Sequence, residues 1–189
     1  MDQGKELKKK LPEHKEVGAD LNSYHSMIAE RAAQINEFKR IREAASHSVI
    51  MVKPLWKLNP TVDDFKEQGF SWYNMPNVGA SQETFIAQGH TTLIVPIQNI
   101  LDSLDEENRE AYLEEEHLFQ ETQCYKILSE WNAGQELVPP HYRHLFDDVF
   151  DVVDGRHRLS LALMLQEREI PMVVAKSEFL LVKRVLKIP

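Results

Sequence analysis

The residues of this chain that are best suited to chemistry stand together in one stretch, Asp154-Gly155-Arg156-His157-Arg158. A β-branched run before it predicts a strand, and apolar residues at helical spacing after it predict a helix. At a strand-to-helix turn, free backbone N–H groups and the positive end of the helix dipole both face a ligand. Gly155 lets the backbone come close, and the three basic side chains donate hydrogen bonds suited to phosphate oxygens. The stretch predicts a phosphate site; the alternative is that Asp154 caps the helix and the basic residues are solvated or paired with acids.

A nucleotide bound at this turn would give each side chain a role. Gly155 and the N–H groups after it would hold phosphate oxygens, and Arg156 and Arg158 would neutralise charge that develops during transfer. His157, whose ordinary pKa is about 6.5, could donate to a phosphate or act as an acid or base. Asp154 could hold Mg²⁺ or orient water. The catalytic candidates are therefore His157, Arg158 and Asp154, with Asp154 as the candidate metal ligand.

Other polar residues near the turn could belong to the same site. Asp151 lies in the strand that leads into it, but alternation puts Asp151 and Asp154 on opposite faces, so the two carboxylates need not converge. Glu136, just before a Pro-rich segment, could point toward the nucleotide.

A second polar cluster contains His141, His144, Asp147 and Asp148. Its His-x-x-His step fits one helical face and would suit a divalent-metal nuclease. The short spacing between Pro140 and Val149, however, suits a loop that joins two strands, in which His and Asp are ordinary surface residues.

The composition of the chain limits which classes of function are possible. The chain has 189 residues, 42% of them hydrophobic, and a formal net charge of −8, so it can bury a core but carries no general basic coat for nucleic acid. Any contact with DNA must be local. The single cysteine, Cys124, cannot form an internal disulfide, the start is too polar for a signal peptide, and the apolar runs are too short to span a bilayer. We expect an intracellular soluble protein.

The first half of the chain predicts one long helix followed by irregular structure. Apolar residues recur at spacings of three and four from Asp20 to about Ser46, which is typical of a helix with one buried face. Residues 47–90 are interrupted by Pro and Gly, so loops and short strands fit them better than long helices. This region is also rich in aromatic side chains, which are more typical of a core than of base stacking: Trp56, Phe70, Trp72 and Tyr73.

The second half predicts alternating strands and helices. Residues 91–97 are β-branched and predict a strand, and the Ser-x-x-Glu pattern at Ser103 predicts a helix that starts near Leu104 and runs through an acidic stretch to a stop at Gly134. Within it, residues 114–117 (Glu-Glu-Glu-His) form a solvated face or, as an alternative, a metal site. A strand at 149–153, a helix at 156–167, a strand at 170–174 and a closing strand or short helix at 179–188 follow. This alternation predicts a mixed α/β domain.

Taken in order, these elements resemble the ParB/sulfiredoxin superfamily over residues 91–175. The motifs that carry the resemblance are a helix ending in Gly134, the Val138-Pro139-Pro140 segment, the run V-V-D-G-R-H-R-L-x-x-A-L, and the strand I-P-M-V-V. The resemblance implies a compact, mixed-sheet α/β (α+β) fold that binds nucleotide phosphates at the start of the helix after the turn. It divides the chain into an N-terminal helical and irregular extension, residues 1–90, and a nucleotide-binding domain, residues 91–189.

The chain departs from three branches of that superfamily. Sulfiredoxins have a reactive cysteine where this chain has Arg156, so sulfinic-acid repair is not expected. The partition proteins carry a long helical DNA-binding region after the nucleotide domain, whereas only about a dozen residues follow Ala175 here. The serine-kinase branch has an early catalytic acid, for which this chain offers no clear match.

As a whole, the chain looks like the plasmid-borne fertility-inhibition and oncogenic-suppression proteins of the superfamily. That resemblance implies ATPase and metal-dependent DNase activity, with ATP and Mg²⁺ as cofactors. It implies DNA as the substrate, either a transferred plasmid or T-DNA, and a type IV secretion system with its coupling protein as the target. The location would be the bacterial cytoplasm or the periphery of the inner membrane. The alternatives are a non-catalytic inhibitor that docks on the transfer machinery, and a nucleotide-dependent kinase of the same fold.

Overall fold

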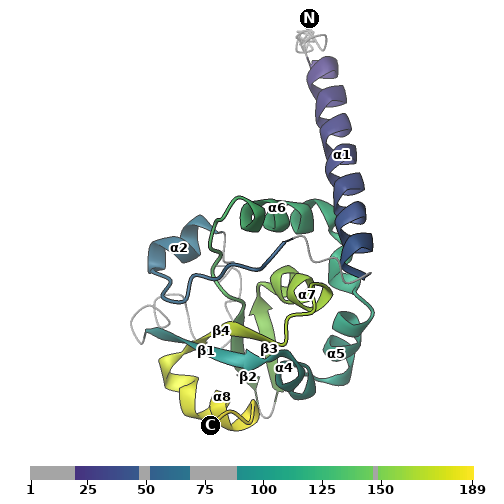
Figure 1. Cartoon of the computed structure of the whole chain (residues 1–189). Coiled ribbons are helices and arrows are strands. Elements are labelled where there is room, and N and C mark those ends of the chain that lie inside the picture. The colour runs from purple at the N-terminus through teal and green to yellow at the C-terminus, as the bar shows by residue number, and fades with distance from the viewer. Residues whose placement is uncertain (1–19, 47–51, 69–88, 147–148) are drawn as a thin grey trace, which may run out of the picture.

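The computed structural model describes residues 20–46, 52–68, 89–146 and 149–189 as a mixed α+β structure with one four-stranded sheet (Figure 1). The strands are β1 (His90–Pro96), β2 (His141–Phe146), β3 (Val149–Asp154) and β4 (Glu169–Ala175). Their order is β1-β4-β2-β3; β4 pairs antiparallel with β1 and parallel with β2, and β2 pairs antiparallel with β3. The mixed sheet agrees with the α+β class predicted from the sequence.

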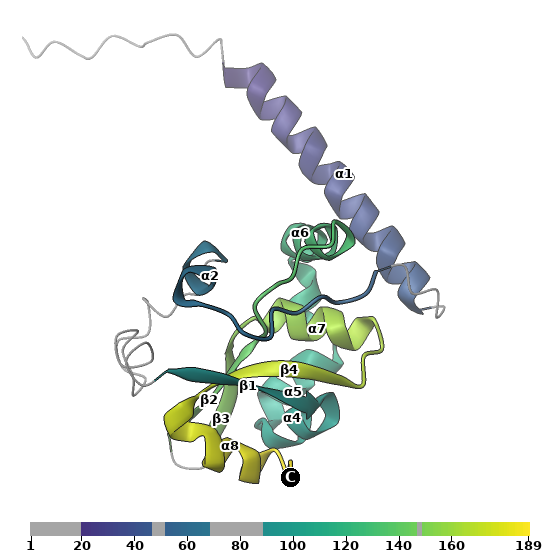
Figure 2. The same cartoon turned by 60° about the vertical axis from the view of Figure 1, so that its left-hand side comes forward.

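The helices surround the sheet. They are α1 (Asp20–Ser46), α2 (Val62–Glu67), α4 (Ile97–Ser103), α5 (Glu106–Leu113), α6 (Glu121–Asn132), α7 (Arg156–Met164) and α8 (Phe179–Val185), with short 3₁₀ turns η2 (Glu116–Phe119) and η3 (Lys176–Glu178). In Figure 2, α7 lies between the sheet and the pair formed by α6 and the end of α1.

Helix α7 is held from both sides. Leu159 and Ala162 belong to the cluster that also contains buried residues of β1, β3, β4 and α8, while Leu161 and Leu165 belong to the cluster built on α1 and α6. All four side chains are almost fully buried. Because both flanks of α7 are packed, the turn that precedes it is fixed relative to the sheet and to α6.

The long N-terminal helix is confirmed, but its predicted buried face is buried only in part. Phe38 is 0% exposed and Ile41 and Ala45 are also buried, whereas Tyr24 and Ile28 are 54% and 47% exposed. Figures 1 and 2 both show the first half of α1 standing clear of the other drawn helices and strands.

The predicted capping box at Ser103 is wrong, although a helix does begin close to Leu104, at Glu106. Ser103 is the last residue of α4, and its hydroxyl donates to the carbonyl of Ile100 (2.6 Å) while it accepts from the Tyr142 hydroxyl (2.6 Å). These hydrogen bonds connect Ser103 to α4 and to β2 rather than to the following helix. Asp105 is the N-cap instead, and its carboxylate accepts from the backbone N–H of Asn108 at 2.8 Å.

The acidic stretch that follows is not one continuous helix. Helix α5 ends at Leu113, and Glu115 adopts a left-handed conformation with φ of 59° before η2. Helix α6 then ends as predicted, with Gly134 at φ of 81°.

The structure tests some of the remaining predictions from the sequence, and the others concern residues outside the described ranges. Residues 141–146 are strand β2, so a loop or a helical His-x-x-His face there is wrong. Trp56 packs edge-on against Trp131, with ring centroids 5.2 Å apart, which confirms its place in the core. Phe70, Trp72, Tyr73, Asp147 and Asp148 are outside the described residues. The division of the chain at residue 90 stays a prediction.

Within the described ranges, no helix combines the length and apolar character that crossing a bilayer requires.

Candidate functional site

The turn between β3 and α7 is built around a glycine with a left-handed backbone. Gly155 is the N-cap of α7 with φ of 80° and ψ of 20°, so the cap residue has no side chain that could accept from the first N–H groups of the helix. A Cβ at this position would lie 2.8 Å from the Cα of Pro140. Glycine is therefore required both by the left-handed backbone and by close packing, and the first N–H groups of α7 are left without an intrahelical acceptor.

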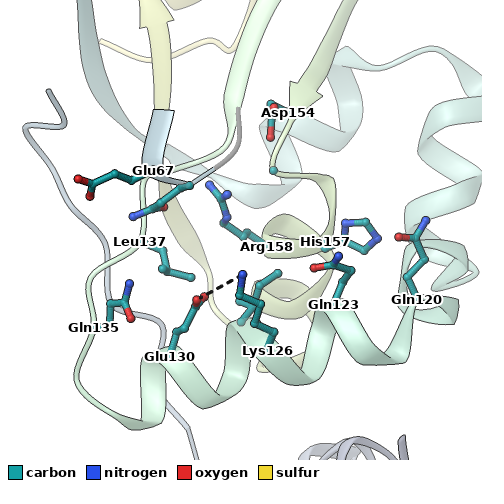
Figure 3. Close-up of a pocket in the computed structure, with 13 residues that line it drawn as sticks. Glu67, Gln120, Gln123, Lys126, Glu130, Gln135, Leu137, Asp154, His157 and Arg158 are labelled. Carbon is teal, nitrogen blue, oxygen red and sulfur yellow. Dashed lines mark ion pairs between the residues drawn. The ribbon is translucent and has the colours of Figure 1, made fainter. Parts of the chain in front are cut away.

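A cavity of about 510 Å³ opens beside this turn. Figure 3 shows Lys126 and Arg158 projecting into it from α6 and α7. Its walls come from the end of α2, one face of α6, the segment after α6 and the β3–α7 turn, with these residues: Glu67, Gln68, Gln120, Gln123, Lys126, Ile127, Glu130, Gln135, Leu137, Asp154, Gly155, His157 and Arg158.

The charges around the cavity nearly balance. Three carboxylates line it, those of Glu67, Glu130 and Asp154, against the two fixed cations Lys126 and Arg158. The Lys126 ammonium lies 4.0 Å from a carboxylate oxygen of Glu130 (Figure 3). Because carboxylates outnumber fixed cations in the lining, a polyphosphate would be held best together with a divalent cation that offsets the carboxylates.

Arg158 is the buried cation of the site. Arg158 is only 9% exposed, and its Nη1 donates to the Val138 carbonyl at 2.5 Å. Burial lowers the pKa of Arg158, while Asp154 and Glu130 oppose that shift. A guanidinium remains charged in proteins, so Arg158 presents a fixed positive charge at the wall of the cavity.

His157 is the acid–base candidate of the site. It is half-buried and lines the cavity, and its pKa is lowered by burial and then by His117 and Arg158, whereas Asp154 raises it. Its ring stands edge-on to His117, with centroids 6.5 Å apart. Among the described residues, Nε2 of His157 has no hydrogen-bond partner. His157 is therefore neutral near pH 7, and its Nε2 is enclosed by the protein rather than open to the cavity.

Arg156, predicted to bind phosphate, has a different environment. Its Nε donates to the Val152 carbonyl at 3.0 Å, and its guanidinium pairs with the Asp151 carboxylate. Arg156 does not line the cavity. Asp151 is 5% exposed, and burial raises its pKa while Arg156 opposes the shift. These two residues form an ion pair in which the Asp151 carboxylate is buried and the Arg156 side chain is partly exposed. Arg156 and Arg158 are therefore in different environments, although only one residue separates them.

The remaining predicted residues lie around the cavity without lining it. His141 is 2% exposed and sits opposite Asp154 in the β2–β3 register; burial lowers its pKa to about 3, with Arg143 and His90 adding to the shift. Glu136 is exposed and does not line the cavity, although Gln135 and Leu137 do.

A metal at this site would depend on the nucleotide for ligands. In the part of the chain that the structure describes, no three His, Cys, Asp or Glu side chains cluster as a metal site, and this includes residues 114–117. Asp154 lines the cavity as one carboxylate. That arrangement fits Mg²⁺, which proteins commonly bind through one or two carboxylates together with substrate phosphates and water.

The sequence analysis did not predict that one face of α6 lines the cavity. Gln120, Gln123, Lys126 and Glu130 follow at spacings of three and four and line the cavity, while Cys124, Leu128 and Trp131 are buried on the other side. The polar periodicity opposite an apolar stripe was the available signal. It indicates a solvent-facing side but not which cavity that side will border.

Comparison of the chain with protein-family models, with curated proteins and with solved structures gave no match. The function is therefore inferred from the geometry of the cavity and the turn.

Proposed function

We propose that the cavity beside the β3–α7 turn binds the phosphates of ATP with Mg²⁺ and hydrolyses the nucleotide. The observation that carries this proposal is that one cavity of about 510 Å³ is bordered by the start of α7 at Gly155 and by Arg158, Lys126 and His157. Backbone N–H groups, two fixed cations and an imidazole are the donors that phosphate recognition uses.

The residues support hydrolysis as follows. The N–H groups of the turn and the Arg158 guanidinium would hold phosphate oxygens and stabilise the charge that builds up as the terminal phosphoryl group leaves. His157, kept neutral by burial, would accept a proton from the attacking water. Bound Mg²⁺ would supply charge neutralisation and orient phosphate oxygens. Asp154 would hold the cation or the water.

The wider function we propose is fertility inhibition in bacteria. The order of motifs over residues 91–175 resembles the ParB/sulfiredoxin superfamily, and the whole chain resembles the oncogenic-suppression protein Osa. On that basis the chain would cleave DNA in a metal-dependent manner and block transfer of T-DNA or a competing plasmid through a type IV secretion system, in the cytoplasm or at the inner membrane.

A second candidate is a nucleotide-binding inhibitor that docks on the coupling protein without cleaving DNA. The net charge of −8 favours it, because nonspecific DNA affinity comes largely from neutralising phosphates. A kinase of the same fold needs an early catalytic carboxylate, and no residue is assigned to that role.

Calorimetry with ATP tests the nucleotide site. We expect binding that requires Mg²⁺ and that weakens about tenfold in Lys126→Ala, because an exposed cation is lost from the cavity wall. Lys66→Ala, on the exposed side of α2, is the matched control and should bind normally. Equal binding in both variants would place the nucleotide elsewhere.

Nicking of plasmid DNA separates the enzyme from the docking protein. We expect Mg²⁺-dependent nicking by the wild type and at least a hundredfold loss in His157→Ala, since general acid–base catalysis contributes about 10²–10⁴-fold. If ATP binds but wild type and His157→Ala are equally inactive on DNA, the docking function is the correct one. Thermal melting of each variant confirms that it is folded.

A further inference from the structure

Helix α1 carries an apolar seam that the other described residues cover at one end only. The seam residues follow at spacings of three and four and therefore share one face: Tyr24, Ile28, Arg31, Ile35, Phe38, Ile41 and Ala45. The last three are buried against the body of the chain, whereas Tyr24 and Ile28 are 54% and 47% exposed. Met27, beside the seam, is 57% exposed. The same face that packs against the chain therefore continues outward without a cover among the described residues.

A groove lies where the seam leaves the body of the chain. It has a volume of about 390 Å³ and is lined by Arg31 and Ile35 of α1 and by residues 119–123. Its apolar side chains are Ile35 and Phe119, the second of which is 70% exposed, and the other lining residues are polar or charged. The exposed seam and the groove thus lie end to end along one helix.

The seam and the groove complement each other when one helix is reversed against another. Eleven residues separate Tyr24 from Ile35, which is about 16 Å along a helix. A twofold axis midway between Ile28 and Arg31 would bring Tyr24 of each copy onto Ile35 and Phe119 of the other. We propose that α1 pairs antiparallel with α1 of a second copy of this chain, with Tyr24 seated in the groove of its partner.

A second copy is the occupant because one chain supplies both halves of the contact, which is the condition for an isologous interface. The buried α1–α6 interface is continuous with the proposed one, since Ile35 adjoins both Phe38 and the groove. Arg31 interrupts the apolar seam, and a polar residue at such a position lowers stability but fixes orientation and register.

The area available indicates a weak dimer. An aromatic side chain buries about 200 Å², so Tyr24 and Phe119, at 54% and 70% exposure, bring about 500 Å² from two copies. Met27 and Ile28 raise the total toward about 1,000 Å², which is the lower limit for a specific interface. We therefore expect dissociation in the micromolar range.

The dimer would also border the nucleotide cavity. Gln120 and Gln123 line both the groove and the cavity. Tyr24 of the partner would thus sit near the rim of the candidate site.

Analytical ultracentrifugation of the full chain tests association. We expect the mass to rise from 22.0 kDa toward twice that value as the protein concentration increases through the micromolar range. Ile28→Glu should remain monomeric. Leu113→Glu, which places the same charge on another exposed apolar residue, should dimerise like the wild type. A wild type that stays monomeric, or equal association of both variants, would overturn the proposal.

Cysteine pairing tests the antiparallel geometry. The natural Cys124 is fully buried and does not interfere. Under an added oxidant, a mixture of Tyr24→Cys chains and Ile35→Cys chains should cross-link, and each variant alone should not. Cross-linking of Tyr24→Cys with itself would indicate a parallel pair and contradict the geometry. Both residues are at least partly exposed, so the variants should fold, as circular dichroism would verify.

Discussion

At the scale of single residues, the candidate site depends most on Gly155. Its positive φ disfavours any side chain, and a Cβ would press on the backbone of Pro140, which cannot rotate away as a flexible side chain can. Backbone conformation and packing therefore impose the same residue.

We expect Gly155→Ala to lower the free energy of unfolding by about 2 kcal/mol or more, since the left-handed backbone alone costs 1–2 kcal/mol. Gly134→Ala is the control, because Gly134 has φ of 81° but no atom within 4 Å of an added Cβ. It should show the conformational cost without the clash. Urea unfolding measures both; an equal loss in the two variants would mean that Pro140 moves aside at no cost.

His141 should make stability depend on pH. The unfolded chain binds a proton there near pH 6.5, whereas burial lowers the folded pKa to about 3. The unfolded state thus holds more protons between these values, so the free energy of unfolding falls as the pH drops below about 6.5. One such group contributes about 1.4 kcal/mol per pH unit.

Urea unfolding between pH 6.5 and pH 5 measures this slope. We expect it to be shallower by about that amount in His141→Asn, which cannot titrate. His157 and His117, whose pKa values are also lowered by burial, act in the same direction and remain in the variant. An unchanged slope would show that His141 is not a neutral buried group at pH 6.5.

At the scale of elements, helix caps decide where the chain turns. Ser103 and Asp105 both have residue types that cap helices, and only the structure shows that the Ser103 hydroxyl is engaged with Ile100 and Tyr142. Helix α5 therefore begins at Glu106, after Asp105.

We expect Asp105→Ala to lower the free energy of unfolding by about 1 kcal/mol, the usual cost of losing an N-cap. The hydrogen bonds from Asn108 lower the pKa of Asp105, so the cap is in place at neutral pH and is lost as the carboxylate is protonated in acid. Chemical unfolding at pH 7 tests this; Asp102→Ala, on the exposed side of α4, should have little effect. A wild-type stability in Asp105→Ala would contradict the assignment of the cap.

The elements that were predicted correctly are those specified by local pattern. The spacing of apolar residues gave the extent of α1, β-branched residues gave β1 and β3, and Gly134 gave the end of α6. Strand β2 was missed because its sequence, His-Tyr-Arg-His-Leu-Phe, contains no β-branched residue, although it pairs with the adjacent strand β3.

The candidate site was predicted in part for the same reason. Gly155, His157 and Arg158 come from one continuous turn, so their proximity follows from sequence. Lys126 comes from another helix, and the direction of Arg156 depends on Asp151 across the bend of the chain. Contacts of that kind are fixed by tertiary packing.

At the scale of the whole molecule, negative charge and local cations coexist. The net charge of −8 is spread over the chain, while Arg158 is held inside the wall of a cavity that also carries carboxylates. The electrostatics of the whole chain therefore argue for a ligand that arrives with its own cation, and the geometry of the turn supplies the place for it.

The packing of Trp131 gives the protein a built-in optical probe. Its indole N–H donates to the Leu55 carbonyl at 3.0 Å and its ring meets Trp56, while Lys126 and Glu130 of the same helix face the cavity. Indole emission responds to small changes in packing and polarity. A ligand that displaces α6 would thus change the intrinsic fluorescence, and occupancy of the cavity could be followed without any attached dye.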